Sequence, residues 1–231
     1  MVYTFHAASM LLLASMVLIA PSAFAIHDWS DAPAGNFGAL DELDAYGLTQ
    51  LMTASEDGNT ELVAALLRAG ANVNLLTKWG GRTALHGAAH NGHIAIAGML
   101  IAAGADVSIT DFHRFTPLHD AVVSGHADMC LLLVVAKSDV NALSAGQMTH
   151  LHFAVQLVDL QIVRILVNAG AVVDLQTVER ETPLDVARRI QSRGGAWRVV
   201  NDASTQKEQL TQIIALLEGV QPVRENQDLL C

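Results

Sequence analysis

The sequence predicts an all-α solenoid, in which repeated helical units stack on one another and share one continuous core. One observation is the motif Thr-Pro-Leu-His-x-Ala, whose clearest copy begins at Thr116. Another is its period, because related copies begin 33 or 34 residues apart at five threonines: Thr49, Thr83, Thr116, Thr149 and Thr182. A fixed period of this length is the sequence signature of a repeat array, whose units contact only their neighbours.

Each copy of the motif predicts the start of a helix. The threonine hydroxyl caps free N–H groups, and proline is favoured at the first helical position. A glycine such as Gly125 then ends the helix, because glycine readily adopts the left-handed conformation found there. A second helix follows with paired aliphatic residues such as Leu66-Leu67, and a Gly-Ala pair such as Gly104-Ala105 closes the unit.

Four features recur in phase from about Asp44 to Leu217: the threonine motif, a Gly-His pair, the paired aliphatic residues and the Gly-Ala ending. In these features the chain resembles the ankyrin-repeat family. The resemblance implies an ankyrin-repeat solenoid of five units, each a short β-hairpin finger followed by two antiparallel helices. The predicted bounds of the repeats are 44–74, 75–108, 109–141, 142–174 and 175–217.

Two repeats depart from the motif at several positions. Repeat one has Gln50 and Met52 in place of proline and histidine, as expected for a terminal unit with one neighbour. Repeat four has His150 in place of proline and Val158-Asp159 in place of Gly-His. These departures concern local turns and leave the existence of the repeats unaffected.

The predicted repeats are followed and interrupted by less regular segments. Repeat five contains a predicted insertion at 191–206, after which Lys207 to Leu217 is expected to form a delayed second helix with one apolar face. Residues 26–43 are predicted to be a linker or an N-terminal cap, and residues 218–231 a flexible tail.

Residues 1–25 have the features of a secretory signal peptide. Met10 to Ala20 is an apolar run too short for a membrane span, and Ala23-Phe24-Ala25 offers the small residues of a cleavage site. We expect cleavage after Ala25, although the lack of Lys and Arg before the run leaves an uncleaved anchor or a mistaken start site as the alternative. The mature chain is then expected to be periplasmic or secreted, which resembles exported bacterial ankyrin-repeat proteins.

The charge of the chain restricts its partners. The formal net charge is −10, which disfavours nucleic acid and anionic membrane surfaces, since both are bound through Lys and Arg. No stable membrane insertion is expected once the signal peptide is removed. Another protein, basic or neutral, is the partner that this charge accommodates most easily.

The ten histidines do not predict a metal site. The resemblance assigns His86, His119 and His152 to the motif, where they are expected to hydrogen-bond backbone, and His93 and His126 to the Gly-His pairs. These side chains lie one per repeat along a stack, so no four of them converge as a tetrahedral zinc site requires. We expect no metal and no other cofactor.

The sequence gives little support for catalysis, and we expect no enzyme. It has no Gly-x-Ser-x-Gly motif and no glycine-rich phosphate loop. Cys130 is expected to be a small buried residue of a second helix. Cys231 is expected to be a free thiol, with a disulfide-linked dimer as the alternative in an oxidising compartment.

The resemblance implies that a partner binds the concave face, which is formed by the finger tips and the exposed side of the first helices. Exposed aromatic residues flanked by Arg and His suit the core of an interface. The alternative is that Trp79 and Phe112 fold back between fingers and only pack the array. The candidate protein-binding residues are Tyr46, Leu48, Trp79, Arg82, His90, Phe112, His113, Arg114, Phe115 and Met148.

The sequence therefore predicts an exported, non-enzymatic scaffold that mediates protein–protein interaction. One alternative is a secreted effector, which would act on host proteins by the same binding chemistry. A less favoured alternative is an accessory factor that supports an enzyme in the periplasm through the 191–206 insertion, which has Arg193, Trp197 and Asp202 but no recognisable nucleophile and base.

Overall fold

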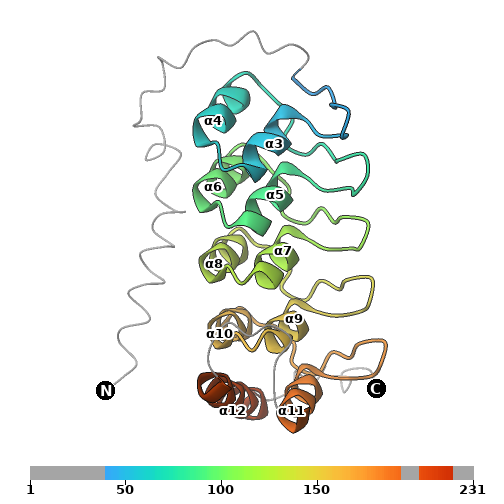
Figure 1. The fold of residues 1–231 in the computed structure, drawn as a ribbon, viewed down its shortest axis with the longest axis vertical. Coiled ribbons are helices and arrows are strands. Elements are labelled where there is room, and N and C mark those ends of the chain that lie inside the picture. The colour runs from blue at the N-terminus through green and yellow to red at the C-terminus, as the bar shows by residue number, and fades with distance from the viewer. Residues whose placement is uncertain (1–39, 194–202, 221–231) are drawn as a thin grey trace, which may run out of the picture.

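The structure, a computed structural model, describes residues 40–193 and 203–220. In these residues ten helices form five pairs, and the pairs stack in chain order along one axis (Figure 1). The first helices of the pairs are α3 (Gln50–Glu56), α5 (Ala84–Asn91), α7 (Pro117–Ser124), α9 (His150–Gln156) and α11 (Pro183–Arg193). The second helices are α4 (Thr60–Arg68), α6 (Ile94–Ala102), α8 (Ala127–Val135), α10 (Leu160–Asn168) and α12 (Ala203–Gly219). This arrangement confirms the predicted all-α solenoid.

Each first helix begins one residue after a motif threonine. At the start of α7, the Thr116 N–H donates to His119 Nδ1 at 3.1 Å, and the His119 N–H donates to the Thr116 hydroxyl at 3.4 Å. His86 and His152 accept the equivalent backbone bond at the starts of α5 and α9. These bonds satisfy N–H groups that a helix start otherwise leaves unpaired. The motif therefore encodes a helix cap.

The turn between the two helices of a pair requires a left-handed backbone. Gly58, Gly92 and Gly125 adopt it with φ of 77°, 72° and 79°. In repeat four Val158 takes the same conformation with φ of 56°, although a β-branched residue is strained there. Repeat four therefore keeps the turn without the Gly-His pair, and the backbone of Val158 is strained there.

The core runs through the whole stack. Each of the first four repeats contributes one fully buried leucine from its first helix and one from its second. These leucines are at most 1% exposed: Leu51, Leu66, Leu85, Leu100, Leu118, Leu133, Leu151 and Leu166. Leu184 of α11 is the motif leucine of the last repeat and is only partly buried. The last described repeat therefore buries its motif leucine less completely than the other four repeats do.

The loops that precede the first helices all extend to the same side of the stack (Figure 1). One backbone hydrogen bond joins each of the first three to the next: Lys78 N–H to Gly47 O at 3.1 Å, Phe112 N–H to Gly80 O at 3.0 Å, and Ala145 N–H to His113 O at 2.9 Å. We call these loops the fingers, numbered by repeat. Within the described residues their β character is limited to one isolated bridge, between Leu143 and Thr149.

The fifth repeat differs from its prediction in the length of the insertion. α11 continues to Arg193 and α12 already begins at Ala203, so both ends of the predicted 191–206 insertion are helical and residues 194–202 lie outside the described residues. α12 contains the expected second helix, and its Leu210, Ile213 and Leu217 are buried against the stack.

The predicted chain ends fall largely outside the described residues. These are the signal peptide at 1–25, most of the 26–43 segment, and the tail beyond 220. At the N-terminal edge of the described part, Leu40 packs against the core and Asp41 Oδ1 accepts the Asn72 N–H at 2.9 Å. None of the described helices combines the length and the hydropathy that a membrane span requires.

Candidate protein-interaction face

Four exposed apolar side chains occupy the same position in different fingers. Tyr46, Trp79 and Phe112 are 33 residues apart and are 78%, 71% and 68% exposed. Ala145 takes this position in finger four, and Val178, 64% exposed, takes it in finger five. We call Tyr46, Trp79 and Phe112 the finger-tip row. Single exposed apolar residues are common, but exposed apolar residues gathered in one patch often mark an interaction site.

Two rings of the row lie against the preceding finger. A Cβ placed on Gly47 would lie 3.3 Å from Trp79 Cδ1, and one placed on Gly81 would lie 2.7 Å from two ring carbons of Phe112. Only glycine leaves room for this approach. Packing between fingers and exposure to a partner are therefore compatible for Trp79 and Phe112, because each ring packs on a neighbouring finger and remains mostly exposed.

Basic side chains accompany the row. Lys78 Nζ lies 4.8 Å from the centroid of the Trp79 ring, within the range of a cation–π contact. Arg114 is exposed, has a left-handed backbone with φ of 60°, and has no side-chain hydrogen bond to another described residue. His113 beside it is also exposed. Fingers two and three thus combine aromatic and positively charged groups.

A largely buried ion pair joins finger two to α7. Arg82 from finger two places Nη2 2.8 Å from Asp120 Oδ2 in α7. Burial raises the pKa of Asp120 to about 6, and the adjacent guanidinium opposes that rise. The carboxylate is 10% exposed and the arginine 30%, so the pair is largely withdrawn from solvent. Sequence reasoning missed Asp120, which is the variable residue of its motif.

His90 and Ser124 complete this cluster but do not form a catalytic relay. Ser124 Oγ lies 3.1 Å from His90 Nδ1, and Asp120 Oδ1 lies 3.9 Å from the same nitrogen. A serine–histidine–aspartate mechanism needs the hydroxyl and the carboxylate on opposite ring nitrogens. Partial burial and Arg82 lower the pKa of His90, which favours its neutral form.

Three candidate residues are less exposed than their prediction requires. Phe115 is half-buried, stacks on His119 with ring centroids 5.0 Å apart, and contacts Phe153 edge-on at 5.3 Å. Leu48 and Met148 are also half-buried. The partners that draw Phe115 inward belong to α7 and α9, so the position of its ring follows from the stack and not from its finger alone.

The motif histidines perform structural tasks. Since Nδ1 of His86 and His152 accepts a backbone N–H, Nε2 is the protonated nitrogen and donates to the carbonyl of the next finger, Phe115 O at 3.0 Å and Glu181 O at 3.1 Å. Burial lowers the pKa of His86 to about 4 and also lowers the pKa of His152. Both side chains therefore stay neutral in the folded protein.

His119 departs from this pattern. The carbonyl that would accept from its Nε2, as Phe115 O does for His86, is Met148 O. This carbonyl is close enough to affect the pKa of His119 but does not form a hydrogen bond of ordinary geometry with it. His119 Nε2 is therefore buried without a partner among the described residues. The ring lies against His150, with centroids 3.7 Å apart. Burial, followed by His150, lowers the pKa of His119 to about 2.

His150 stands where the motif has proline and bonds in two directions. Its Nδ1 lies 3.0 Å from Val140 O and its Nε2 lies 3.2 Å from the Thr116 hydroxyl, so it links repeats three and four. Burial lowers its pKa to about 4. No group of three or more His, Cys, Asp or Glu side chains in the described part of the chain is placed to hold a metal ion.

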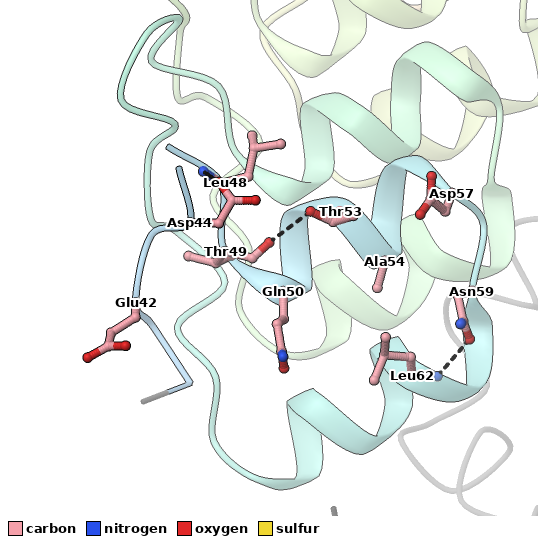
Figure 2. A pocket seen from close by; sticks show the side chains of 10 residues that line it. All are labelled: Glu42, Asp44, Leu48, Thr49, Gln50, Thr53, Ala54, Asp57, Asn59 and Leu62. Carbon is pink, nitrogen blue, oxygen red and sulfur yellow. Dashed lines mark hydrogen bonds between the residues drawn. The ribbon is translucent and has the colours of Figure 1, made fainter. Parts of the chain in front are cut away.

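A shallow depression of about 500 Å³ lies at the N-terminal end of the stack, on α3 and α4 (Figure 2). Its lining includes the carboxylates of Glu42, Asp44 and Asp57 and no positively charged side chain. Figure 2 shows that the Asn59 side chain there is bonded to the Leu62 N–H, at 3.0 Å, as a helix cap. This depression is on the outer surface of the first repeat that the structure describes.

The stacked pairs, the capped first helices and the joined fingers define a class of protein, the repeat solenoid that presents one continuous face. A family model for ankyrin repeats in three copies matches residues 33–111, 51–144 and 118–193. The chain belongs to the ankyrin-repeat family. Members of this family generally serve as non-enzymatic scaffolds that bind other proteins, and this chain is such a protein-interaction scaffold.

One curated protein is similar over a short stretch. The probable E3 ubiquitin-protein ligase XBOS31 of Oryza sativa subsp. japonica is 43% identical over 68 residues. The match covers 29% of this chain and 15% of that protein, so the chain spans only a small part of the relative's length. The similarity is to a segment of the ligase and carries no ligase activity to this chain.

Proposed function

We propose that this protein is an exported scaffold that binds one partner protein through the concave side of fingers two and three. The observation that carries this proposal is the finger-tip row, whose rings are exposed and two of which, those of Trp79 and Phe112, lie against glycines of the preceding finger. Fixed aromatic anchors favour binding, because little side-chain freedom is lost when the partner docks. The basic groups of Lys78 and Arg114 surround them.

The export part of the proposal is supported by the sequence of the first 25 residues. The apolar run and the Ala23-Phe24-Ala25 site are those of a cleaved signal peptide. A scaffold and a host-directed effector would use the same binding face, so the destination of the protein distinguishes them. The chain covers too little of the rice ligase for any ubiquitin-related function to be proposed.

The test is affinity capture from the native envelope and secreted fractions. The tagged full-length protein is compared with a Trp79→Ser/Phe112→Ser variant and with a Leu76→Ser control, which removes an exposed apolar residue outside the row. We expect one protein to be captured by the parent and by the control and to be lost with the double variant. Mass spectrometry of the same bait should find Ile26 at its N-terminus.

Equal capture by the double variant, in a protein that unfolds at the parent temperature, would exclude the finger-tip row as the binding site. An intact N-terminal segment on the bait, or a bait found only in the cytosol, would exclude export by a cleaved signal peptide.

A further inference from the structure

We propose that the finger-tip row binds a proline-rich, acidic segment of the partner in the polyproline II conformation. This inference rests on the proposed function and specifies the chemistry of the partner. Each turn of the segment would place one apolar face on one ring of the row, while its acidic side chains would approach Lys78 and Arg114.

The spacing of the row carries the first step. Helices of consecutive repeats pack roughly 8–10 Å apart, so side chains at one position of successive fingers recur at about that interval. A polyproline II helix has three residues per turn and rises about 3.1 Å per residue, so the same face recurs about every 9.3 Å. A β-strand presents the same face about every 6.7 Å, which does not match.

An α-helix comes close to the interval in length, but its shape fits the row less well. Its same face recurs after seven residues, about 10.5 Å, but its diameter with side chains is about 10–12 Å and it binds in an apolar groove. The row is a single file. In sequence the rings are followed by Gly47, Gly80 and His113 and preceded by Ala45, Lys78 and Asp111, so no second bulky apolar residue adjoins them. A narrow ligand without internal hydrogen bonds suits this surface better.

The construction of the row carries the second step. The Trp79 and Phe112 rings rest on glycines of the preceding finger and keep 71% and 68% of their surface exposed. Flat aromatic surfaces of this kind are what polyproline II ligands contact in known recognition grooves. Both partners are then ordered before they meet, which reduces the entropy lost on binding.

Charge carries the third step. Residues 40–136 contain four Lys and Arg side chains, and three of them lie in fingers two and three: Lys78, Arg82 and Arg114. Arg82 is paired with Asp120. The Asp111 carboxylate accepts the N–H groups of His113 and Phe115, both at 2.8 Å, and is thereby engaged in its own turn. Lys78 lies over the Trp79 ring, and neither it nor Arg114 pairs with a carboxylate among the described residues, so both can meet acidic side chains of a ligand although the whole chain is acidic.

The test uses fluorescent synthetic peptides and the full-length protein. A peptide of repeated Pro-Pro-Glu triplets presents one glutamate face and two prolyl faces along a polyproline II helix. It is compared with a peptide of the same composition in which the glutamates are irregularly spaced, with a Pro-Pro-Lys peptide, and with an amphipathic helical peptide that has apolar residues seven apart.

We expect the Pro-Pro-Glu peptide to bind about tenfold more tightly than each of the other three, a difference equivalent to about 1.4 kcal/mol. Trp79→Ser and Phe112→Ser should each weaken it about tenfold, as loss of an aromatic anchor does, and Leu76→Ser should not change it. Ala145→Tyr should extend the row by one ring and tighten binding of a longer triplet peptide.

No binding of the Pro-Pro-Glu peptide, or equal binding of the irregular or helical peptide, would overturn this inference. Such a result leaves the proposed function to its own test, because a captured protein that depends on Trp79 and Phe112 would still identify the face. If the peptide does not bind and capture of the partner protein does not depend on Trp79 and Phe112, both this inference and the proposed function are rejected.

Discussion

Within residues 40–193 and 203–220, five residues other than glycine adopt a left-handed backbone, and each stands where other repeats have glycine. Arg114, Gln147 and Arg180 share their finger position with Gly47 and Gly81. Lys137, with φ of 71°, corresponds to Gly70, Gly104 and Gly170, and Val158 corresponds to Gly58, Gly92 and Gly125. The array therefore imposes the backbone, and the residue accepts the strain.

Lys137→Gly tests this strain at an exposed position. A left-handed residue with a side chain costs about 1–2 kcal/mol, while the extra freedom of glycine in the unfolded chain costs about 0.5–1 kcal/mol. We expect the free energy of unfolding to rise by about 0.5–1 kcal/mol, measured by urea denaturation. Lys137→Ala removes the same charge and keeps the strain, so it should give no gain; an equal gain in both variants would assign the effect to charge.

Sequence patterns predicted these residue-scale features unevenly. The spacing of the glycines along the chain is enough to identify Lys137 and Val158 as exceptions to the repeat. The Arg82–Asp120 pair was not predicted, because position 120 corresponds to Thr53, Gly87, Phe153 and Val186 in the other repeats and so has no fixed residue type. The inward position of Phe115 depends on rings from two other elements, which the finger sequence does not report.

At the scale of elements, the contact between α7 and α9 is built differently from the others. Four rings lie between these helices: Phe115, His119, His150 and Phe153. The corresponding residues at α3 and α5 are not aromatic: they are Leu48, Met52, Ala84 and Gly87. Repeats three and four are thus joined by buried aromatic and polar groups, among them two histidines whose pKa burial lowers.

The folded protein should lose stability in acid because its buried histidines resist protonation. The pKa of His86 and that of His150 are lowered from 6.5 to about 4, and the pKa of His119 to about 2. As pH falls below 6.5, the unfolded chain takes up protons that the folded chain does not, so the free energy of unfolding falls. The raised pKa of Asp120 acts with the opposite sign between about 6 and 3.8.

His150→Pro tests the contribution of this joint and restores the residue found in Thr116-Pro117. One histidine that is protonated only in the unfolded state contributes about 1.4 kcal/mol per pH unit to the slope. We expect the slope of unfolding free energy against pH, between about 6 and 4, to become shallower by up to that amount. His113→Gln, at an exposed finger tip, is the matched control; an unchanged slope in His150→Pro would show that His150 is protonated while folded.

At the scale of the whole molecule, the stack is a linear array in which stability depends on neighbours. The period of the motif predicted this architecture, since five phased copies can bury their apolar faces only by stacking. The end of α11 at Arg193 and the start of α12 at Ala203 were not predicted. The repeat pattern stops at Ile190, and the composition of the sequence after it is typical of a loop. The exposure of the Trp79 and Phe112 rings could not be predicted in detail, since each ring lies against a glycine of the preceding finger.

The position of a residue in the array should decide the cost of losing its side chain. Leu151 of α9 is fully buried between repeats three and five, whereas Leu184 of α11 belongs to the last repeat and is only partly buried. We expect Leu151→Ala to lower the free energy of unfolding by about 3–5 kcal/mol and Leu184→Ala by about half as much, because fewer packed neighbours surround the second cavity. Urea denaturation of both variants measures the difference. Equal costs would mean that the last repeat is packed as tightly as an inner one.

Because Leu151 is fully buried and offers no surface to a partner, any loss of partner binding in Leu151→Ala should follow its loss of stability and disappear under conditions that restore folding.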